Sequence, residues 1–320
     1  MRSINTIHST KIGIVLQLRT VIDGRLHLCY HPNENGYKEK NVPYRNADRE
    51  KAAYYAAEVI RENLGIASDR EQPIGLVLGT GWGDVLPIEG AAMLSFRDIP
   101  GFETLETLEG HARTVVSGRV ADKLVLALRG RVHLNEAPCD QNIAKMVRLQ
   151  IEMLLKCDVR TLILTSAVGA LPRPVSRLFQ VGEVCIVNGF VTLYAPDMPL
   201  WAGEFCSPED TLNKALQSTA IKMAQDVKGG TAGHVMVRGP FFEGRRHDKE
   251  LLARTGASVV GMSMLPEACI AALYDDASVL GLGFVTNDAV ETHSHEENLA
   301  RAAAAREKLG TYLTRIIAAL

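Results

Sequence analysis

Two short segments of the chain combine turn residues with cationic or titratable side chains. They are Glu109-Gly110-His111-Ala112 and Gly130-Arg131-Val132-His133. Because side chains alternate along an extended backbone, Arg131 and His133 would point to the same side and could hold one anion. A histidine in isolation is more often a surface or core residue than a ligand, so His111 and His133 gain weight only from their context.

A glycine-rich segment, Gly79-Thr80-Gly81-Trp82-Gly83, follows a continuous apolar run at 74–78. Glycines let the backbone approach an anion, and Thr80 offers a hydroxyl and an amide to phosphate oxygens. The spacing is not G-x-G-x-x-G and no Walker lysine follows, which disfavours dinucleotide and nucleoside triphosphate sites. A tight turn from a strand into a helix would use the same glycines.

A third segment, Gly239-Pro240-Phe241-Phe242-Glu243, places an acid directly after two aromatic residues. This order suits an apolar platform for a flat ring with a carboxylate at its edge. A solvated glutamate beside core phenylalanines would give the same residues. Segments 261–267 and 285–288 similarly leave polar side chains after apolar runs, where ligands bind in open α/β sheets.

The elements that position these segments alternate between short apolar runs and helical patterns. Strands are predicted at 74–78, 123–128, 161–165, 184–187, 235–237, 258–260 and 279–285, and helices over 143–154 and 266–274. This alternation predicts an α/β fold, a single domain with a central mixed β-sheet and flanking helices.

The two ends of the chain carry further signals. Residues 1–45 are turn-rich and differ from the rest, so we interpret them as an N-terminal extension and residues 46–320 as the domain. A helical pattern starts at Ala47 and stops at Gly65. Ser294-x-x-Glu297 fits a capping box, which predicts one long amphipathic helix to Leu320 with His295 in its first turn.

Composition excludes several classes of protein. The 320 residues are 47% hydrophobic and 22% charged, as in globular proteins, and a net charge of −2 disfavours nucleic-acid binding. The apolar stretch 12–18 is too short to span a membrane and lacks the features of a signal peptide. The six cysteines are scattered without a C-x-x-C pair, so we expect a reducing, cytoplasmic location.

Six segments, in their order along the chain, resemble the trimeric purine nucleoside phosphorylase and methylthioadenosine phosphorylase superfamily over about residues 47–320. They are 109–112, 130–133, 162–169, 239–243, 260–263 with Pro266-Glu267, and Thr286-Asn287. The resemblance implies a nucleoside phosphorylase/hydrolase-like fold and a pentosyltransferase that converts a purine nucleoside and phosphate to free base and ribose 1-phosphate in purine salvage. It also implies a homotrimer, with phosphate as co-substrate and no metal or other cofactor.

The resemblance also assigns residues to each part of the site. Phosphate binding is implied for Thr80, His111, Arg131, His133, the amide of Ala167, and Ser263. Nucleoside binding is implied for Asn135, Trp201, Phe242, Glu243, Met262, Asn287 and His295, with His111, Glu243 and Asn287 as the catalytic residues. Several hydrogen-bond donors that converge with a guanidinium suit an anion. Trp201 aligns with an aromatic residue that family members lend to a neighbouring subunit.

Some positions depart from the family pattern. Asn135 stands where a tyrosine is usual, Ser166 replaces an asparagine, and Thr80 replaces a serine. Asn135 and Thr80 remain hydrogen-bonding residues, so we expect altered sugar affinity rather than lost activity. The interval from Glu243 to Met262 is one residue longer than in the family, and it contains the basic segment 245–247.

The subclass depends on Asn287. In the family, asparagine there suits a 6-oxopurine such as that of inosine or guanosine, whereas methylthioadenosine phosphorylases carry aspartates for a 6-amino group. Methylthioadenosine phosphorolysis remains an alternative, as does a catalytically weak purine-binding homologue, which Asn135, Ser166 and the unusual N-terminus motivate. A metal site at 293–296 lacks third and fourth ligands nearby, and a serine hydrolase would need a Gly-x-Ser-x-Gly elbow.

Overall fold

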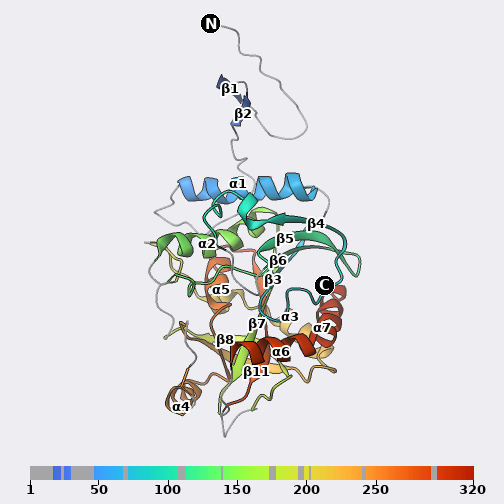
Figure 1. Cartoon of the computed structure of the whole chain (residues 1–320), viewed down its shortest axis with the longest axis vertical. Helices are drawn as coiled ribbons and strands as arrows, with labels where there is room; N and C mark the ends of the chain where they lie inside the picture. The colour runs from blue at the N-terminus through green and yellow to red at the C-terminus, as the bar shows by residue number, and fades with distance from the viewer. Residues whose placement is uncertain are drawn as a thin grey trace. The chain divides into compact units, whose positions relative to one another are not determined.

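The computed structural model describes the chain except residues 1–16, 23–24, 30–46, 68–70, 107–111, 138–139, 173–177, 194–197, 202, 240–242, 245 and 290–293 (Figure 1). The chain divides into two compact units, Met1–Glu39 and Lys40–Leu320. In the first unit, β1 (Gln17–Ile22) and β2 (Arg25–Cys29) pair antiparallel. All further elements belong to the second unit.

A nine-stranded sheet forms the centre of the second unit, with the order β10-β9-β8-β11-β7-β3-β6-β5-β4. Its strands are β3 (Ile74–Leu78), β4 (Glu89–Ser95), β5 (Thr114–Val120), β6 (Lys123–Arg129), β7 (Thr161–Ala170), β8 (Val184–Val191), β9 (Gly230–Met236), β10 (Val259–Gly261) and β11 (Ser278–Asn287). The predicted α/β class with a central mixed sheet is confirmed.

Parallel pairing dominates the middle of this sheet. β3 runs parallel to both β6 and β7, and β7 runs parallel to β11. The end of β7 also pairs antiparallel with β10, Val260 facing Gly169, so that β7, β11, β8, β9 and β10 form a closed ring of pairings. Since the carboxyl ends of parallel strands meet at one edge, residues that follow β3, β6, β7 and β11 come together there.

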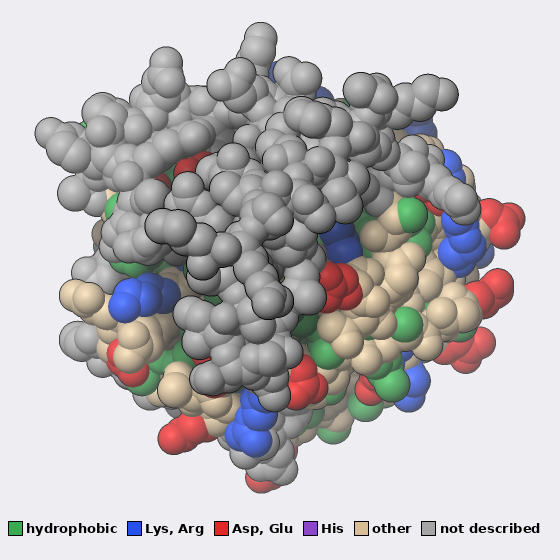
Figure 2. Space-filling view, turned by 90° about the horizontal axis from the view of Figure 1, so that it is seen from above, with side chains coloured by type: hydrophobic (Ala, Val, Ile, Leu, Met, Phe, Trp, Pro, Cys, Tyr) green, Lys and Arg blue, Asp and Glu red, His purple; other side chains and the backbone are tan. Residues whose placement is uncertain are grey.

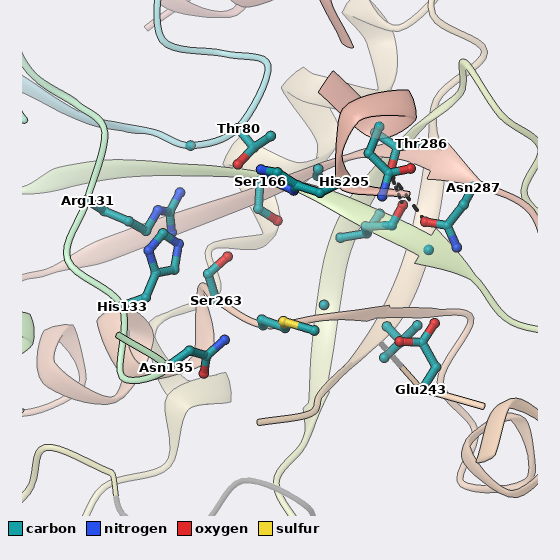
Figure 3. A pocket seen from close by; sticks show the side chains of 18 residues that line it. Thr80, Arg131, His133, Asn135, Ser166, Glu243, Ser263, Thr286, Asn287 and His295 are labelled. Atoms are coloured by element: carbon teal, nitrogen blue, oxygen red, sulfur yellow. Dashed lines mark hydrogen bonds between the residues drawn. The ribbon is translucent and has the colours of Figure 1, made fainter. Parts of the chain in front are cut away.

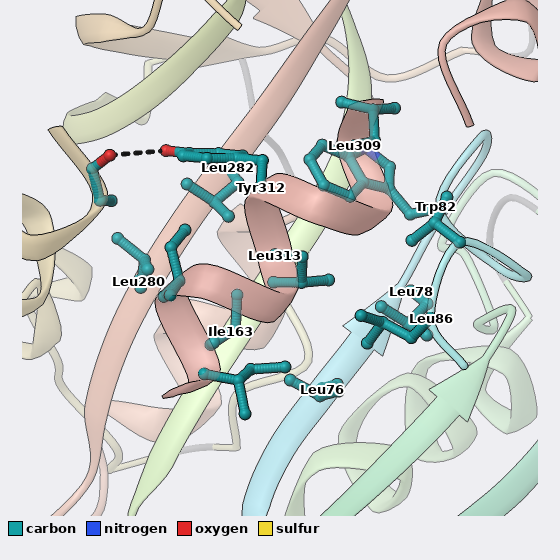
Figure 4. Close-up of a cluster of buried hydrophobic side chains, with 14 of the residues drawn as sticks. Leu76, Leu78, Trp82, Leu86, Ile163, Leu280, Leu282, Leu309, Tyr312 and Leu313 are labelled. Atoms are coloured by element: carbon teal, nitrogen blue, oxygen red, sulfur yellow. Dashed lines mark hydrogen bonds between the residues drawn. The ribbon is translucent and has the colours of Figure 1, made fainter. Parts of the chain in front are cut away.

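One face of the sheet packs against α3 (Lys214–Met223) and α7 (Arg306–Ala318). Alternate residues of the strands point to this face, such as Leu76 and Leu78 of β3, and meet Leu313 of α7 (Figure 4). The Tyr312 hydroxyl crosses to α3 and donates to the Ala220 carbonyl at 3.0 Å. Burial of each of these leucine side chains stabilises the fold by roughly 1.5–3 kcal/mol. This layer therefore fixes the positions of the strands that carry the site.

A second group of helices is formed by α1 (Ala47–Leu64), α2 (Gln141–Lys156) and α5 (Leu265–Ala271), and α2 contacts both of the others. The predicted helix start at Ala47 and stop before Gly65 are confirmed. Asp140 caps α2 by accepting from the Asn142 amide at 2.8 Å. A further short helix, α4 (His247–Arg254), follows the segment that contains Glu243.

The prediction of one long C-terminal helix is wrong. The capping box of Ser294 and Glu297 forms as predicted, but α6 (His295–Ala304) ends at Ala305 and α7 begins at Arg306. Beyond the break, Arg306 Nε donates to the Asp84 carbonyl at 2.9 Å. A Cβ at Gly310 would lie 2.2 Å from the Val85 carbonyl oxygen. Beyond the break at Ala305, α7 thus packs closely against the backbone at Asp84 and Val85.

The described surface carries charges of both signs. Lysine and arginine side chains are interspersed with aspartate and glutamate side chains on the face shown in Figure 2. This mixture agrees with the small net charge of −2. Within the described ranges, the helices are too short or too polar to cross a lipid bilayer.

Candidate active site

A cavity of ≈ 200 Å³ lies at the edge of the sheet where the parallel strands end. The residues that line it come from segments far apart in sequence: Gly79, Thr80, Arg131, His133, Asn135, Ser166, Ala167, Val168, Gly169, Glu243, Val260, Gly261, Met262, Ser263, Thr286, Asn287, His295 and Asn298. Ten of the thirteen residues that the sequence predicts for the site are among them. The topology therefore brings residues from five of the six family segments, together with Gly79 and Thr80, to one pocket.

Five of the six predicted phosphate ligands line this pocket. Thr80 follows β3, Arg131 and His133 follow β6, Ala167 lies in β7, and Ser263 follows β10 (Figure 3). Hydroxyl, imidazole and guanidinium groups face a common space here. Such a set of donors suits a compact anion.

Among these residues, Arg131 is fully buried. Its Nη1 donates to Glu267 Oε1 at 2.5 Å, and its Nη2 donates to the Thr165 carbonyl and, at 3.4 Å, to that of Val77. A Cβ at Gly79 would lie 2.7 Å from Nη2, so glycine there makes room for the guanidinium. The terminal nitrogens of Arg131 are thus held in place from behind the pocket.

His133 is oriented by Glu136. The Glu136 carboxylate accepts from the His133 backbone amide at 2.7 Å, and its Oε1 lies 3.6 Å from His133 Nδ1. Burial raises the pKa of Glu136, but hydrogen bonds from His133 and the charge of Arg113 outweigh it, so this pKa lies below its ordinary value. Glu136 is therefore an ionised anchor for the His133 segment.

Arg113 completes this network from the neighbouring loop. Its Nη2 donates to Glu136 Oε2 at 2.5 Å and its Nη1 donates to the Glu106 carbonyl. Its backbone has φ 49°, the left-handed region that costs a residue other than glycine about 1–2 kcal/mol. The hydrogen bonds of the Arg113 side chain therefore hold a strained backbone position next to the His133 segment.

Glu243 and Asn287 lie at the opposite end of the pocket from Arg131 (Figure 3). Asn287 ends β11 and is 3% exposed. Its Oδ1 accepts from the Thr286 hydroxyl at 3.3 Å, whereas its Nδ2 has no hydrogen-bond partner among the described residues. A buried amide with an N–H left over can donate to a ligand.

Further polar side chains and one methionine line the pocket. They are Asn135, Ser166, His295, Asn298 and Met262. Asn135 Oδ1 and Ser166 Oγ are buried and have no partner in the described part of the protein. These atoms offer hydrogen bonds to a polar ligand.

Three predicted residues are not placed in this pocket. His111 and Phe242 lie outside the described residues. Trp201 is absent from the lining; its ring lies under the Arg148 guanidinium, 5.4 Å from the ring centroid, and its backbone amide donates to Glu204 Oε2 at 2.8 Å. Arg148 in turn pairs with both oxygens of Glu204, at 2.5 and 2.9 Å. This clamp fixes the Trp201 segment to α2.

Several residues around the pocket escaped the sequence analysis. Asn298 stands one helical turn after His295, a spacing that could have indicated it. Glu136 stands three residues after His133 and could have been found in the same way. Lys249 lies in α4 and contacts Glu243, but no local motif marks it.

The family model described as the phosphorylase superfamily matches residues 73–318. The chain therefore belongs to the phosphorylase superfamily, as the resemblance of its motifs implied. Within that superfamily it is a homologue of purine nucleoside phosphorylases, which are pentosyltransferase-type enzymes.

Two bacterial relatives illustrate the relationship. The chain is 31% identical over 277 residues to purine nucleoside phosphorylase of Mycobacterium tuberculosis, which covers 85% of this chain and 97% of that protein. It is also 31% identical to purine nucleoside phosphorylase 1 of Bacillus subtilis, over 76% of this chain and 89% of that protein.

Solved structures confirm the fold. The structure of purine nucleoside phosphorylase from Schistosoma mansoni in complex with inosine matches 86% of this chain and 97% of its own, with a TM-score of 0.73 and 23% identity. The complex of the Schistosoma mansoni enzyme with adenosine matches with the same TM-score and identity. At this identity the likeness concerns the arrangement of strands and helices.

Proposed function

We propose that the protein catalyses the reversible phosphorolysis of 6-oxopurine ribonucleosides and deoxyribonucleosides, such as inosine and guanosine. The products are the free base and ribose 1-phosphate or its deoxy form, as in purine salvage. The observation that supports the proposal most strongly is that the two ends of the pocket differ in chemistry. Arg131, His133 and Ser263 lie at one end and Glu243 with Asn287 at the other (Figure 3). A nucleoside and phosphate fit this arrangement with the sugar in the middle.

At the first end, phosphate would bind below the sugar. Thr80, Ser263 and the Ala167 amide would donate to its oxygens, and Arg131 and His133 would supply the remaining donors, together with His111 from the segment outside the described residues. The bound anion stabilises the positive charge that develops on the sugar as the glycosidic bond breaks. Phosphate is the co-substrate, and the proposed reaction needs no metal or other cofactor.

At the second end, the leaving base becomes an anion. The unpartnered Nδ2 of Asn287 would donate to N7 of the purine, and this bond strengthens as negative charge develops on the base. Glu243 would accept from N–H groups of the base. Asn135, Met262 and His295 would contact the sugar, and Phe242 the base.

Two finer features also belong to the proposal. Trp201 does not line the pocket of its own chain. We propose that the protein forms a homotrimer, in which Trp201 would complete the pocket of a neighbouring subunit. Among the described residues, Cys157, Cys185 and Cys269 are not joined in disulfides, which supports a reducing, cytoplasmic location.

A panel of four nucleosides tests the substrate class. Inosine, guanosine, adenosine and methylthioadenosine are each incubated with the enzyme, with and without phosphate, and the release of base is followed. The proposal predicts phosphate-dependent release from inosine and guanosine. A preference for methylthioadenosine would instead support the related phosphorylase class, and tight binding without turnover would indicate a purine-binding homologue.

A further inference from the structure

A buried lysine stands directly behind the base end of the pocket. Lys249 of α4 is fully buried, and its Nζ donates to the Asp288 carbonyl at 2.7 Å. The same Nζ lies 3.7 Å from Oε1 of Glu243. The side chains of Lys249 and Glu243 are 1% and 6% exposed, so their charges face each other with little water between them.

The start of α4 fixes the distance between these two groups. The Lys249 amide donates to the Gly244 carbonyl at 3.1 Å, and the Gly244 amide donates to Asp248 Oδ2 at 2.8 Å. The first turn of α4 therefore folds back on the residue that follows Glu243. Because Lys249 is also tied to the backbone beside Asn287, it connects the two polar groups at the base end of the pocket.

An ammonium in this position holds the side chain of Glu243 in place. Opposite charges that face each other away from water attract more strongly than they do at the surface, so Lys249 draws Oε1 of Glu243 toward α4. The Glu243 carboxylate can accept hydrogen bonds from a ligand. The contact with Lys249 involves Oε1, and Glu243 lines the pocket.

We propose that Lys249 is a positioning residue that sets the base specificity of the pocket by holding the Glu243 carboxylate, a hydrogen-bond acceptor, in the orientation that meets the base. A 6-oxopurine presents an N–H at N1, and guanine adds an exocyclic N–H, and both suit a carboxylate. The N1 of adenine is itself an acceptor and meets the carboxylate unfavourably. This inference rests on the proposed function, since it assigns the selectivity of the same site.

The test compares three substitutions of Lys249 by the ratio of kcat/KM values for inosine and adenosine. Lys249→Met removes both the charge and the hydrogen bond to Asp288. Lys249→Gln removes the charge but keeps a donor for the Asp288 carbonyl, and Lys249→Arg keeps the charge. Lys222→Met, at an exposed position of α3, is the matched control.

In Lys249→Met and in Lys249→Gln, we expect the inosine-to-adenosine ratio to fall by at least about tenfold, because a mismatched hydrogen bond discriminates strongly between substrates. Lys249→Arg and Lys222→Met should retain most of the ratio, and the KM for phosphate should change less than twofold in all four variants. A ratio that Lys249→Gln leaves unchanged would overturn the inference, since it would reduce Lys249 to a structural tie to Asp288.

A double variant shows whether Lys249 acts through Glu243. With Glu243→Gln in place, Lys249 has no carboxylate to hold, so a further change of Lys249→Gln should leave the ratio within about twofold. A full additional loss would contradict the proposed route. Wild-type enzyme without phosphate-dependent cleavage of any nucleoside would refute the proposed function itself, whereas an active wild type with an unmoved ratio would refute only the role of Lys249.

Discussion

The guanidinium of Arg131 donates to the carboxylate of Glu267 at 2.5 Å, with both side chains at most 2% exposed. The pair joins the loop after β6 to α5, which begins two residues after Ser263. Both segments contribute to the anion end of the pocket. This buried ion pair thus links the segment that carries Arg131 to the helix that follows Ser263.

Removing one member of this pair should destabilise the folded protein. Arg131→Met leaves the Glu267 carboxylate buried without its cation, so we expect the free energy of unfolding to drop by about 3–5 kcal/mol. The double variant Arg131→Met/Glu267→Leu removes both charges and should be more stable than Arg131→Met alone. Urea unfolding monitored by circular dichroism measures both values. A loss below about 1 kcal/mol in the single variant would show that the pair does not hold these segments.

Replacing Arg113 should weaken the binding of phosphate and leave the binding of the nucleoside nearly unchanged. Arg113→Met frees Glu136 from its second partner and loosens the anchor of His133. Loss of one charge-assisted hydrogen bond of about 1.5 kcal/mol should raise the KM for phosphate roughly tenfold, with the KM for inosine nearly unchanged. Initial rates at varied phosphate and inosine provide both constants.

Arg119 supplies the control for this experiment. It lies in the neighbouring β5 and pairs with Glu71 at 2.7 Å, but its side chain is 50% exposed and outside the pocket. Arg119→Met should leave both KM values unchanged. Equal increases in the two KM values of Arg113→Met would argue against a specific role in the anion end.

His234 should make the protein less stable at mildly acidic pH. It is fully buried in β9, its ring meets Phe190 edge-on, and burial lowers its pKa to about 4. As pH falls from about 6.5 to 4, the unfolded chain binds a proton at this histidine while the folded protein does not, so stability falls by about 3 kcal/mol over this window.

The variant His234→Leu should lack this contribution. The difference in unfolding free energy between wild type and variant, measured at several pH values, should be constant above about pH 7. It should move in favour of the variant as the pH decreases toward 4. A difference that is independent of pH throughout would mean that His234 is protonated in the folded protein as readily as in the unfolded chain.

The substitution of Asn287 by aspartate tests which class of purine the pocket accepts. An amide can donate to N7 and adapt to O6, whereas an ionised carboxylate only accepts. Asn287→Asp should therefore penalise inosine and relatively favour adenosine, which the ratio of the two kcat/KM values reports. If the ratio does not move, Asn287 does not contact the base.

The sequence predicts best those elements whose residues are buried on both sides. The strand at Ile74–Leu78 has the predicted bounds because every residue in it is apolar or glycine and buried. The edge strand β4 was missed because Glu89–Ser95 is largely exposed and carries a glycine and two alanines. The neighbouring β5 contains Gly118 and Arg119, which interrupt its apolar pattern.

The sequence motifs identify pocket residues at the ends of the strands. They do not identify the side chains that hold these residues in place from behind. Glu267 contacts Arg131 across 136 residues of sequence. Lys249 reaches the Asp288 carbonyl because α4 packs against β9 and β10, next to the end of β11 in the sheet. Such partners depend on tertiary packing, which leaves no local signal. The break at Ala305 is similar, since it follows from the contacts of Arg306 and Gly310 with the backbone at Asp84 and Val85.

The most direct test of the proposed function is the stoichiometry of the reaction with inosine. Hypoxanthine release is measured by absorbance, and the phosphorus-containing product by ³¹P nuclear magnetic resonance on the same sample. Phosphorolysis predicts one phosphate consumed and one ribose 1-phosphate formed for each hypoxanthine released, with no release when phosphate is omitted. Release of hypoxanthine together with free ribose, at a rate independent of phosphate, would contradict the proposed function.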